Sequence, residues 1–257
     1  ISIMGNYHGL SLLFFSLLVS SAFSAELCHP DDKKALFRIK KAFNNAYEFA
    51  SWTPDTDCCD WYLVKCDEKT HRITSLSVTD DNEVAGPIPD AVGDLPYLQD
   101  LSLGYLPKLV GPVPQAVARL KYLQFLWITH TNITGPVLYF LGQLTELNYI
   151  NLSVNKLTGT IPSSLSNLHK FGAIFLERNR LTGSIPDSFG GLKNNKDVYL
   201  RLAKNQLSGP IPKSLGAVNF TVIDLSRNQF TGDASFLFGE NKGLLDVDLS
   251  MNKFSFN

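Results

Sequence analysis

The chain has 257 residues, of which 44% are hydrophobic and 18% are charged, a composition typical of soluble domains with one or two buried cores. The formal net charge is −1, so no strongly basic field exists to attract nucleic acid or an anionic membrane surface. The composition therefore argues against a nucleic-acid-binding protein and against a highly charged carrier.

The N-terminal segment has the pattern of a secretory signal. The first 24 residues contain no Lys, Arg, Asp or Glu and include a short apolar run, Leu10 to Val19. Ala22-Phe23-Ser24 follows, with small residues where a signal peptidase requires them. We expect residues 1–24 to be a cleaved signal peptide; a buried core helix is the alternative. No second apolar run of about 18 residues follows, so we expect a secreted chain without a membrane anchor.

Cysteine usage agrees with export. The four cysteines, Cys28, Cys58, Cys59 and Cys66, all lie near the start of the expected mature chain. Of the three possible pairings, disulfide geometry disfavours the one that joins adjacent Cys58 and Cys59, and two pairings stay open. The spacing gives no CxxC clamp, which argues against zinc or another bound metal. We expect two disulfides that staple a small N-terminal cap.

A repeat dominates the rest of the chain. Its plainest copy, Ile150 to Pro162, follows the pattern LxLxxNxLxGxIP, and its glycine recurs every 23 to 26 residues from Gly86 to Gly232. This period is that of leucine-rich repeats. We expect about eight such units over residues 73–257, after a capping segment over residues 25–72.

Each repeat position has a physical role. The aliphatic residues point inward on a short strand, so the residue between them points outward. The recurring Asn can bond backbone groups that the turn leaves unpaired, Gly allows a sharp bend, and Ile-Pro favours an irregular or 3₁₀ return. The sequence predicts an α/β solenoid: a right-handed superhelix with a concave parallel sheet, a 3₁₀ or irregular convex side and a disulfide-stapled helical cap. The cap helix is expected within residues 31–43, with Leu36, Ile39 and Phe43 on one face.

Several non-consensus segments resemble the plant polygalacturonase-inhibiting proteins, a family to which some antifreeze proteins are also similar. These segments are Glu26 to Leu36, Ser51-Trp52, Asp57 to Tyr62, Val92 to Leu98, Ile128 to Asn132, and Gly232 to Gly239. The resemblance implies a plant cell-wall or apoplast protein that binds fungal endopolygalacturonase through its concave face, and it also implies Cys28–Cys58 and Cys59–Cys66 pairing. Cell-wall pectin is a second candidate ligand. Because family chains continue into further repeats and a C-terminal cap, we expect that cap to be missing here.

The outward positions of successive strands predict a partner-binding strip. Between the core aliphatics stand Ser102, Trp127, Asn151, Phe175, Arg201, Asp224 and Asp248. The flanking positions of the predicted strip are Phe125, Tyr149, Tyr199, Thr129, Ser153, Glu177, Ser226, His130, Arg178, Lys204 and Arg227. Exposed aromatic residues with interspersed Arg are typical of protein interfaces. Lateral packing of the aromatics across strands, and mutual pairing of the charges, are the alternatives.

Three sequons, at Asn132, Asn151 and Asn219, predict glycosylation. A glycan on Asn151 would block the strip, so we expect Asn151 to be unmodified or to mark its edge.

Competing functions have less support in the residues. No nucleophile elbow, metal-ligand spacing or phosphate loop indicates an enzyme or a bound cofactor, although Asp224 and Asp248 on neighbouring strands superficially suit a glycosidase. Ice binding would require a flat, regular array of small residues, whereas the predicted concave rows are bulky and irregular. A receptor-like ectodomain cut from a longer gene is the third alternative.

Overall fold

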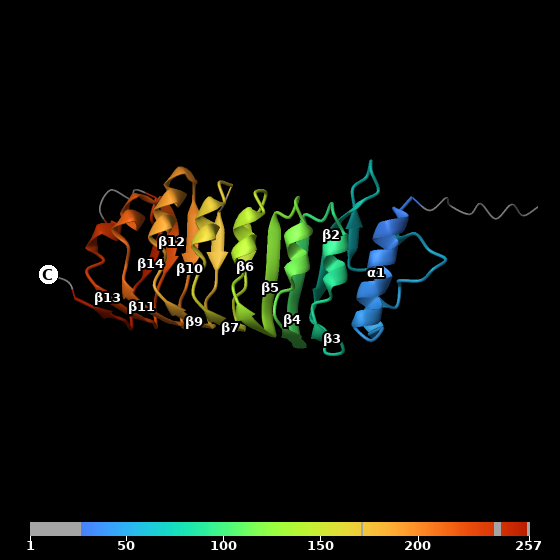
Figure 1. The fold of residues 1–257 in the computed structure, drawn as a ribbon, viewed down its shortest axis with the longest axis horizontal. Helices are drawn as coiled ribbons and strands as arrows, with labels where there is room; N and C mark the ends of the chain where they lie inside the picture. Colours follow the sequence, from blue (N-terminus) through green and yellow to red (C-terminus); the bar gives the residue numbers. More distant parts are fainter. Residues whose placement is uncertain (1–26, 171, 239–242, 256–257) are drawn as a thin grey trace, which may run out of the picture.

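The chain is a leucine-rich-repeat solenoid, as the repeat predicts. The computed structural model describes residues 27–170, 172–238 and 243–255, and the expected signal peptide lies outside them. The coils stack along one long axis, from helix α1 (Pro30–Ala42) at one end to the coils of β12–β15 at the other (Figure 1).

One strand from each coil joins a continuous parallel sheet. Neighbouring strands pair in chain order, and the short strand β1 (Val64–Cys66) adds to the N-terminal edge in antiparallel orientation. The parallel strands are β2 (Ile73–Thr79), β4 (Asp100–Gly111), β5 (Phe125–Pro136), β6 (Tyr149–Asn151), β8 (Ala173–Phe175), β10 (Val198–Arg201), β12 (Phe220–Asp224) and β14 (Asp246–Asp248). This is the expected concave sheet.

A second row of parallel strands was not predicted. It consists of β3 (Ala85–Pro87), the ends of β4 and β5, β7 (Lys156–Gly159), β9 (Arg180–Gly183), β11 (Gln206–Pro210), β13 (Gln229–Gly232) and β15 (Lys253–Phe254). The sequence predicted only an irregular return here. Leu157 is buried and Thr158 exposed, so the segment alternates as a strand does. Each strand then bends at a glycine such as Gly159, whose φ of 78° confirms the expected sharp turn.

The return path on the other side is made of 3₁₀ helices, as expected. They are η3 (Asp90–Asp94), η4 (Gln115–Arg119), η5 (Tyr139–Gln143), η6 (Ser163–Asn167), η7 (Asp187–Asn194), η8 (Lys213–Ala217) and η9 (Ser235–Phe238). Helix η7 has 8 residues where its neighbours η6 and η8 have 5, and this accommodates the longest repeat unit.

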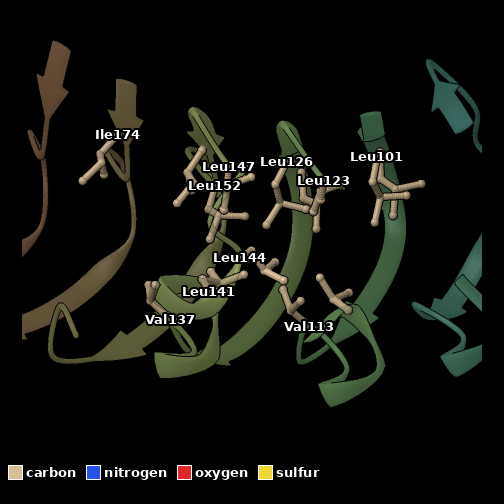
Figure 2. Packing of buried hydrophobic residues seen from close by; sticks show 14 of the residues in the cluster. Leu101, Val113, Leu123, Leu126, Val137, Leu141, Leu144, Leu147, Leu152 and Ile174 are labelled. Carbon is tan, nitrogen blue, oxygen red and sulfur yellow. The ribbon is translucent and has the colours of Figure 1, made fainter. Parts of the chain in front are cut away.

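The core is a continuous column of aliphatic side chains between the sheet and the 3₁₀ helices. Leu101, Leu126 and Ile174 point inward from β4, β5 and β8, and Val113 and Leu141 meet them from the opposite wall (Figure 2). All five are at most 4% exposed. Because each coil packs only on its neighbours, this column holds the stack together.

The recurring asparagine reinforces the column with hydrogen bonds. Asn179 Nδ2 donates to the carbonyl oxygens of Leu176 in its own coil and Leu152 in the preceding one, at 3.1 and 2.9 Å. Its Oδ1 accepts from the Leu157 amide at 2.9 Å. Equivalent bonds form at the other members of this asparagine column, Asn155, Asn205, Asn228 and Asn252. The predicted structural role is confirmed, and each side chain also ties two coils together.

The N-terminal cap closes the first coil. Cys28 pairs with Cys58 and Cys59 with Cys66, as the family resemblance implied. Leu36 and Ile39 on α1, and Phe43 directly after it, are buried.

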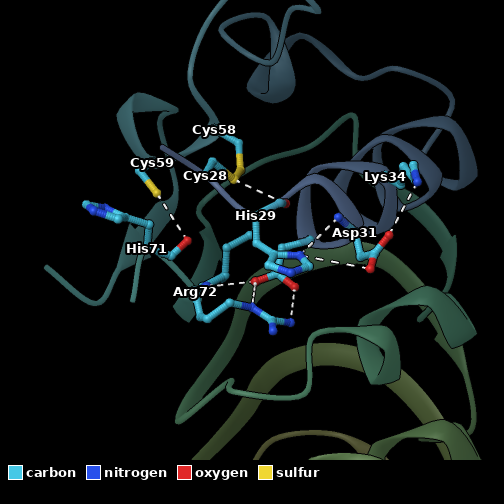
Figure 3. A network of polar contacts seen from close by, with 10 residues as sticks. Cys28, His29, Asp31, Lys34, Cys58, Cys59, His71 and Arg72 are labelled. Atoms are coloured by element: carbon cyan, nitrogen blue, oxygen red, sulfur yellow. Dashed lines mark hydrogen bonds and ion pairs between the residues drawn. A yellow bond between two sulfur atoms is a disulfide. The ribbon is translucent and has the colours of Figure 1, made fainter. Parts of the chain in front are cut away.

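A buried ion pair, which the sequence did not reveal, also joins the cap to the repeats. The fully buried Asp32 carboxylate accepts two bonds from the Arg72 guanidinium and one from the Ile73 amide; Figure 3 shows Arg72 in this network. These bonds join α1 to the start of β2.

Candidate binding face

The seven predicted outward residues form one continuous row. Strand pairing sets Ser102 beside Trp127, Trp127 beside Asn151, and so on through Phe175, Arg201 and Asp224 to Asp248. All seven are half-buried or exposed. We call these seven residues the concave row. Their side chains lie on the face of the sheet that points away from the core.

The N-terminal part of the face is aromatic. The Trp127 indole lies against Gly104 of the neighbouring strand, where any Cβ would overlap the ring. The Tyr105 ring stacks on His130 with centroids 4.2 Å apart, and it also approaches Trp127 at 6.3 Å. The prediction missed both Gly104 and Tyr105, because the repeat around Leu106-Pro107-Lys108 departs from the consensus. Aligning Gly104 with Thr129 and Tyr105 with His130 would have located them.

Aromatic contacts continue along the next strands. Phe125 packs on Tyr149 at 6.1 Å, and Tyr149 meets the edge of Phe175 at 5.5 Å. The Arg201 guanidinium lies over the Phe175 ring at 5.5 Å. The predicted lateral packing of aromatics therefore occurs, yet Phe125 is still 43% exposed. The rings hold one another in place and still present surface to a partner.

The C-terminal part of the face is charged. A concavity of about 440 Å³ is lined by Glu177, Arg178, Arg201, Ala203, Lys204, Asp224, Ser226, Arg227 and Asp248. The four cations are exposed, whereas the three carboxylate side chains are half-buried. Within the described residues, no ion pair of 4.0 Å or less joins them, so the alternative, mutual pairing of these charges, is not seen. We call this region the charged pocket; it presents mainly positive charge to solvent.

Two carboxylates of the charged pocket differ in their electrostatics. Burial raises the pKa of Glu177, and its Oε2 atom is buried without a hydrogen-bond partner. Hydrogen bonds from the Ser250 hydroxyl and amide lower the pKa of Asp248.

The prediction was wrong for three residues of the strip, which are buried. Thr129, Ser153 and Ser226 are 2%, 4% and 5% exposed, so they do not form an accessible row. Thr129 Oγ1 bonds Ser153 across adjacent coils, and the Ser226 amide donates to Asp224. Small hydroxyl side chains at this position satisfy the turn beneath larger neighbours.

The next position in each repeat projects outward instead. His130, Arg178, Lys204 and Arg227 are exposed and have left-handed backbones with φ between 52° and 56°. A bend at this position aims four of the predicted strip residues away from the core.

The three sequons lie in different surroundings. Asn132 Nδ2 donates to the Pro107 carbonyl at 2.7 Å, and Asn151 Oδ1 accepts from the Ser153 amide and hydroxyl. Asn219 is exposed. The expected glycosylation at these sites stays a prediction.

Candidate metal ligands and membrane segments were also considered. The cysteines that cluster in the cap, Cys28, Cys58, Cys59 and Cys66, are all joined in disulfides. Over residues 27–170, 172–238 and 243–255, no helix has the length and apolarity needed to cross a bilayer.

Comparison with known proteins agrees with this fold. The family model described as Leucine rich repeat N-terminal domain matches residues 29–67, and Leucine Rich Repeat matches residues 146–168 and 173–192. A plant ice-binding protein has a similar structure, with a TM-score of 0.87 and 46% identity over 90% of this chain and 74% of that one. The chain is thus a plant-type leucine-rich-repeat protein with a repeat-specific cap.

Sequence relatives define the family more closely. A polygalacturonase inhibitor from Pyrus communis is 55% identical over 246 residues, which cover 95% of this chain and 73% of the relative. Polygalacturonase inhibitor 2 from Arabidopsis thaliana is 53% identical over 250 residues, covering 96% and 75%. The chain belongs to the polygalacturonase-inhibitor family.

Proposed function

We propose that the protein binds a fungal endopolygalacturonase through its concave face and inhibits it in the plant cell wall. The observation that carries this proposal is the 55% identity to a named polygalacturonase inhibitor along nearly the whole chain. The exposed aromatic and cationic side chains of the concave face supply a surface of suitable chemistry. In this proposal the protein acts as a binder that covers the enzyme's substrate cleft and catalyses nothing.

The dimensions of the sheet suit such a partner. Eight parallel strands at roughly 4.8 Å spacing extend over about 35 Å, which is enough for an interface of about 800 Å² on each protein. The aromatic part would provide desolvated anchors, while the charged pocket would guide approach and register. The two cap disulfides support an extracellular location. The four exposed cations also make cell-wall pectin, a polyanion, a proposed second ligand.

Inhibition assays test the proposal directly. The purified chain is titrated into a panel of fungal endopolygalacturonases while reducing-end release and binding are measured. We expect saturable inhibition of at least one enzyme, weakened by Trp127→Ala and unchanged by Tyr139→Ala, since Tyr139 lies exposed on η5. Inhibition that is equal in the two variants would move the interface off the concave face, and no binding to any enzyme would reject the function.

Ice binding is the second candidate, favoured by the 46% identity to a plant ice-binding protein. The surfaces give it less support. On the second row of strands, Thr158 pairs with Pro136 on one side and Arg180 on the other. Thr158 therefore does not stand beside the corresponding threonine of either neighbouring strand. Long cationic side chains such as Arg180 interrupt the row of threonines. Thermal hysteresis measured beside the inhibition assays separates the two functions, and we expect inhibition without hysteresis.

A further inference from the structure

A gap interrupts the aromatic side chains along one edge of the concave face. Strand pairing aligns Phe125 with Tyr149, Tyr149 with Ala173, and Ala173 with Tyr199. Three of these four neighbouring strands present an aromatic ring, and β8 between the two tyrosines presents only a methyl group. The residue before it is Gly172, where the preceding coil has Asn148. One coil thus lacks bulk at two consecutive positions.

The missing side chains leave a pocket. It has a volume of about 440 Å³ and is lined by Asn148, Tyr149, Lys170, Gly172, Ala173, Phe175 and Tyr199. Tyr149 and Tyr199 lie two strands apart, which is roughly 9.6 Å. A planar ring in contact with both needs about 7–8 Å, twice a carbon contact distance. We call this pocket the aromatic slot; its width suits a single planar ring.

The fold does not require the slot to be empty. A Cβ at Gly172 would meet only the Asn148 carbonyl oxygen at 3.6 Å, an ordinary contact. The Gly172 amide donates to the Asn148 carbonyl oxygen at 2.8 Å, so the backbone keeps its regular pairing. The adjacent coils carry tyrosine at the position of Ala173. Larger residues would therefore fit the backbone, and among the residues that the structure describes no side chain fills the slot, which leaves room for a ligand.

The charges around the aromatic slot indicate what its occupant carries. Phe175 forms one wall, and the Arg201 guanidinium lies over this ring at 5.5 Å. Arg201 also lines the charged pocket with three further exposed cations, Arg178, Lys204 and Arg227. On the other side Lys170 is held by Glu146 at 2.6 Å. An apolar slot thus opens next to a surface of mainly positive charge.

We propose that the aromatic slot receives an aromatic side chain of the partner protein, carried on an acidic segment whose carboxylates meet Arg201 and its cationic neighbours. The occupant's ring would complete the row of rings between Tyr149 and Tyr199. This inference rests on the proposed function for the identity of the partner, although the slot's chemistry can be tested without that partner.

Peptide titrations test the slot itself. Amide shifts of the full chain are followed by NMR as acetyl-Gly-Tyr-Asp-Asp-amide is added, with Tyr-Lys-Lys and Ala-Asp-Asp analogues as controls. We expect shifts at Gly172, Ala173 and Tyr199 with the first peptide, and at least fivefold weaker binding of each analogue. Equal binding of the three peptides would overturn the proposal. So would shifts at these residues with trigalacturonate alone, because the slot would then take a sugar ring.

Filling the slot tests its role in the complex. Ala173→Tyr places in β8 the side chain that both neighbouring strands already carry. We expect it to abolish the peptide shifts and to weaken binding of an inhibited endopolygalacturonase at least tenfold. Asn167→Tyr adds the same side chain at an exposed position of η6, away from the concave face, and we expect no change in binding from it. Unchanged enzyme binding by Ala173→Tyr would overturn the slot as an anchor. If no endopolygalacturonase binds the unmodified chain, the proposed function fails, and the peptide result alone decides the slot.

Discussion

Two sets of residues in the same repeats follow opposite rules. The asparagine column bears the same side chain in five successive coils, and each amide bonds the backbone of two coils. The concave row, four positions earlier in each repeat, has a different residue in almost every coil and changes from aromatic to charged. Buried backbone groups demand one hydrogen-bonding solution, whereas a solvent-facing position makes no such demand. The repeating positions hold the fold, and the varying ones are free to select a partner.

Removing one member of the asparagine column should have the largest effect. Asn179→Ala leaves the Leu157 amide and two carbonyl oxygens without their side-chain partner, and we expect a loss of about 3 kcal/mol in unfolding free energy. Denaturant unfolding measures it, with Asn167→Ala on the exposed η6 as the control. An equal effect from both variants would contradict a structural role specific to the column.

Removing the main aromatic of the concave row should affect binding and spare folding. We expect Trp127→Ala to cost about 2 kcal/mol of partner affinity, because the half-buried indole is held against Gly104 as a rigid anchor. Calorimetric titration with an inhibited endopolygalacturonase, beside thermal unfolding, separates the two effects. A large drop in melting temperature at unchanged affinity would show that Trp127 stabilises the fold and does not contact the partner.

Removing a cation of the row should have a smaller effect, of about 1 kcal/mol in affinity. Arg201→Ala eliminates one exposed charge next to Phe175, so association should also slow and depend less on salt. Association rates at several ionic strengths measure this. Arg180→Ala, an exposed arginine on β9, is the matched control, and equal rate changes in the two variants would show a general charge effect.

The smallest effect should come from Glu177 and should depend on pH. Burial raises its pKa in the folded state, so the folded chain binds this proton more tightly than the unfolded chain. The resulting stability is present at acidic pH and is lost as pH rises through the folded pKa. We expect Glu177→Gln to raise the melting temperature slightly at pH 7 and not at pH 4. The reverse order would show that the ionised carboxylate stabilises the fold.

Sequence patterns predicted the solenoid because the repeat specifies it many times over. The core aliphatics, the asparagine column and the 3₁₀ returns all follow from positions that recur, and each copy supports the others. The disulfide pairing came only from resemblance, since geometry left two pairings open. The second row of strands was missed because Gly and Pro suggested a turn where Leu157 and Thr158 alternate.

The candidate site was predicted less completely. The seven residues of the concave row were correctly predicted to point outward, because side chains alternate between the two faces of a strand. Thr129, Ser153 and Ser226 were wrong, since the left-handed residue after each one bends the chain and turns the hydroxyl inward. Contacts between coils, such as Trp127 over Gly104 or Arg72 with Asp32, join residues 23 and 40 positions apart and leave no local signal.

Hydroxyl-radical footprinting of the complex with an inhibited endopolygalacturonase tests the central claim most directly, because aromatic side chains on every face of the solenoid can be followed at once. Binding through the concave face predicts strong protection of Phe125, Trp127 and Tyr105, with Tyr139 and Phe238 on the 3₁₀ side as reactive as in the free chain. Protection of Tyr139 and Phe238 with Trp127 left reactive would contradict it.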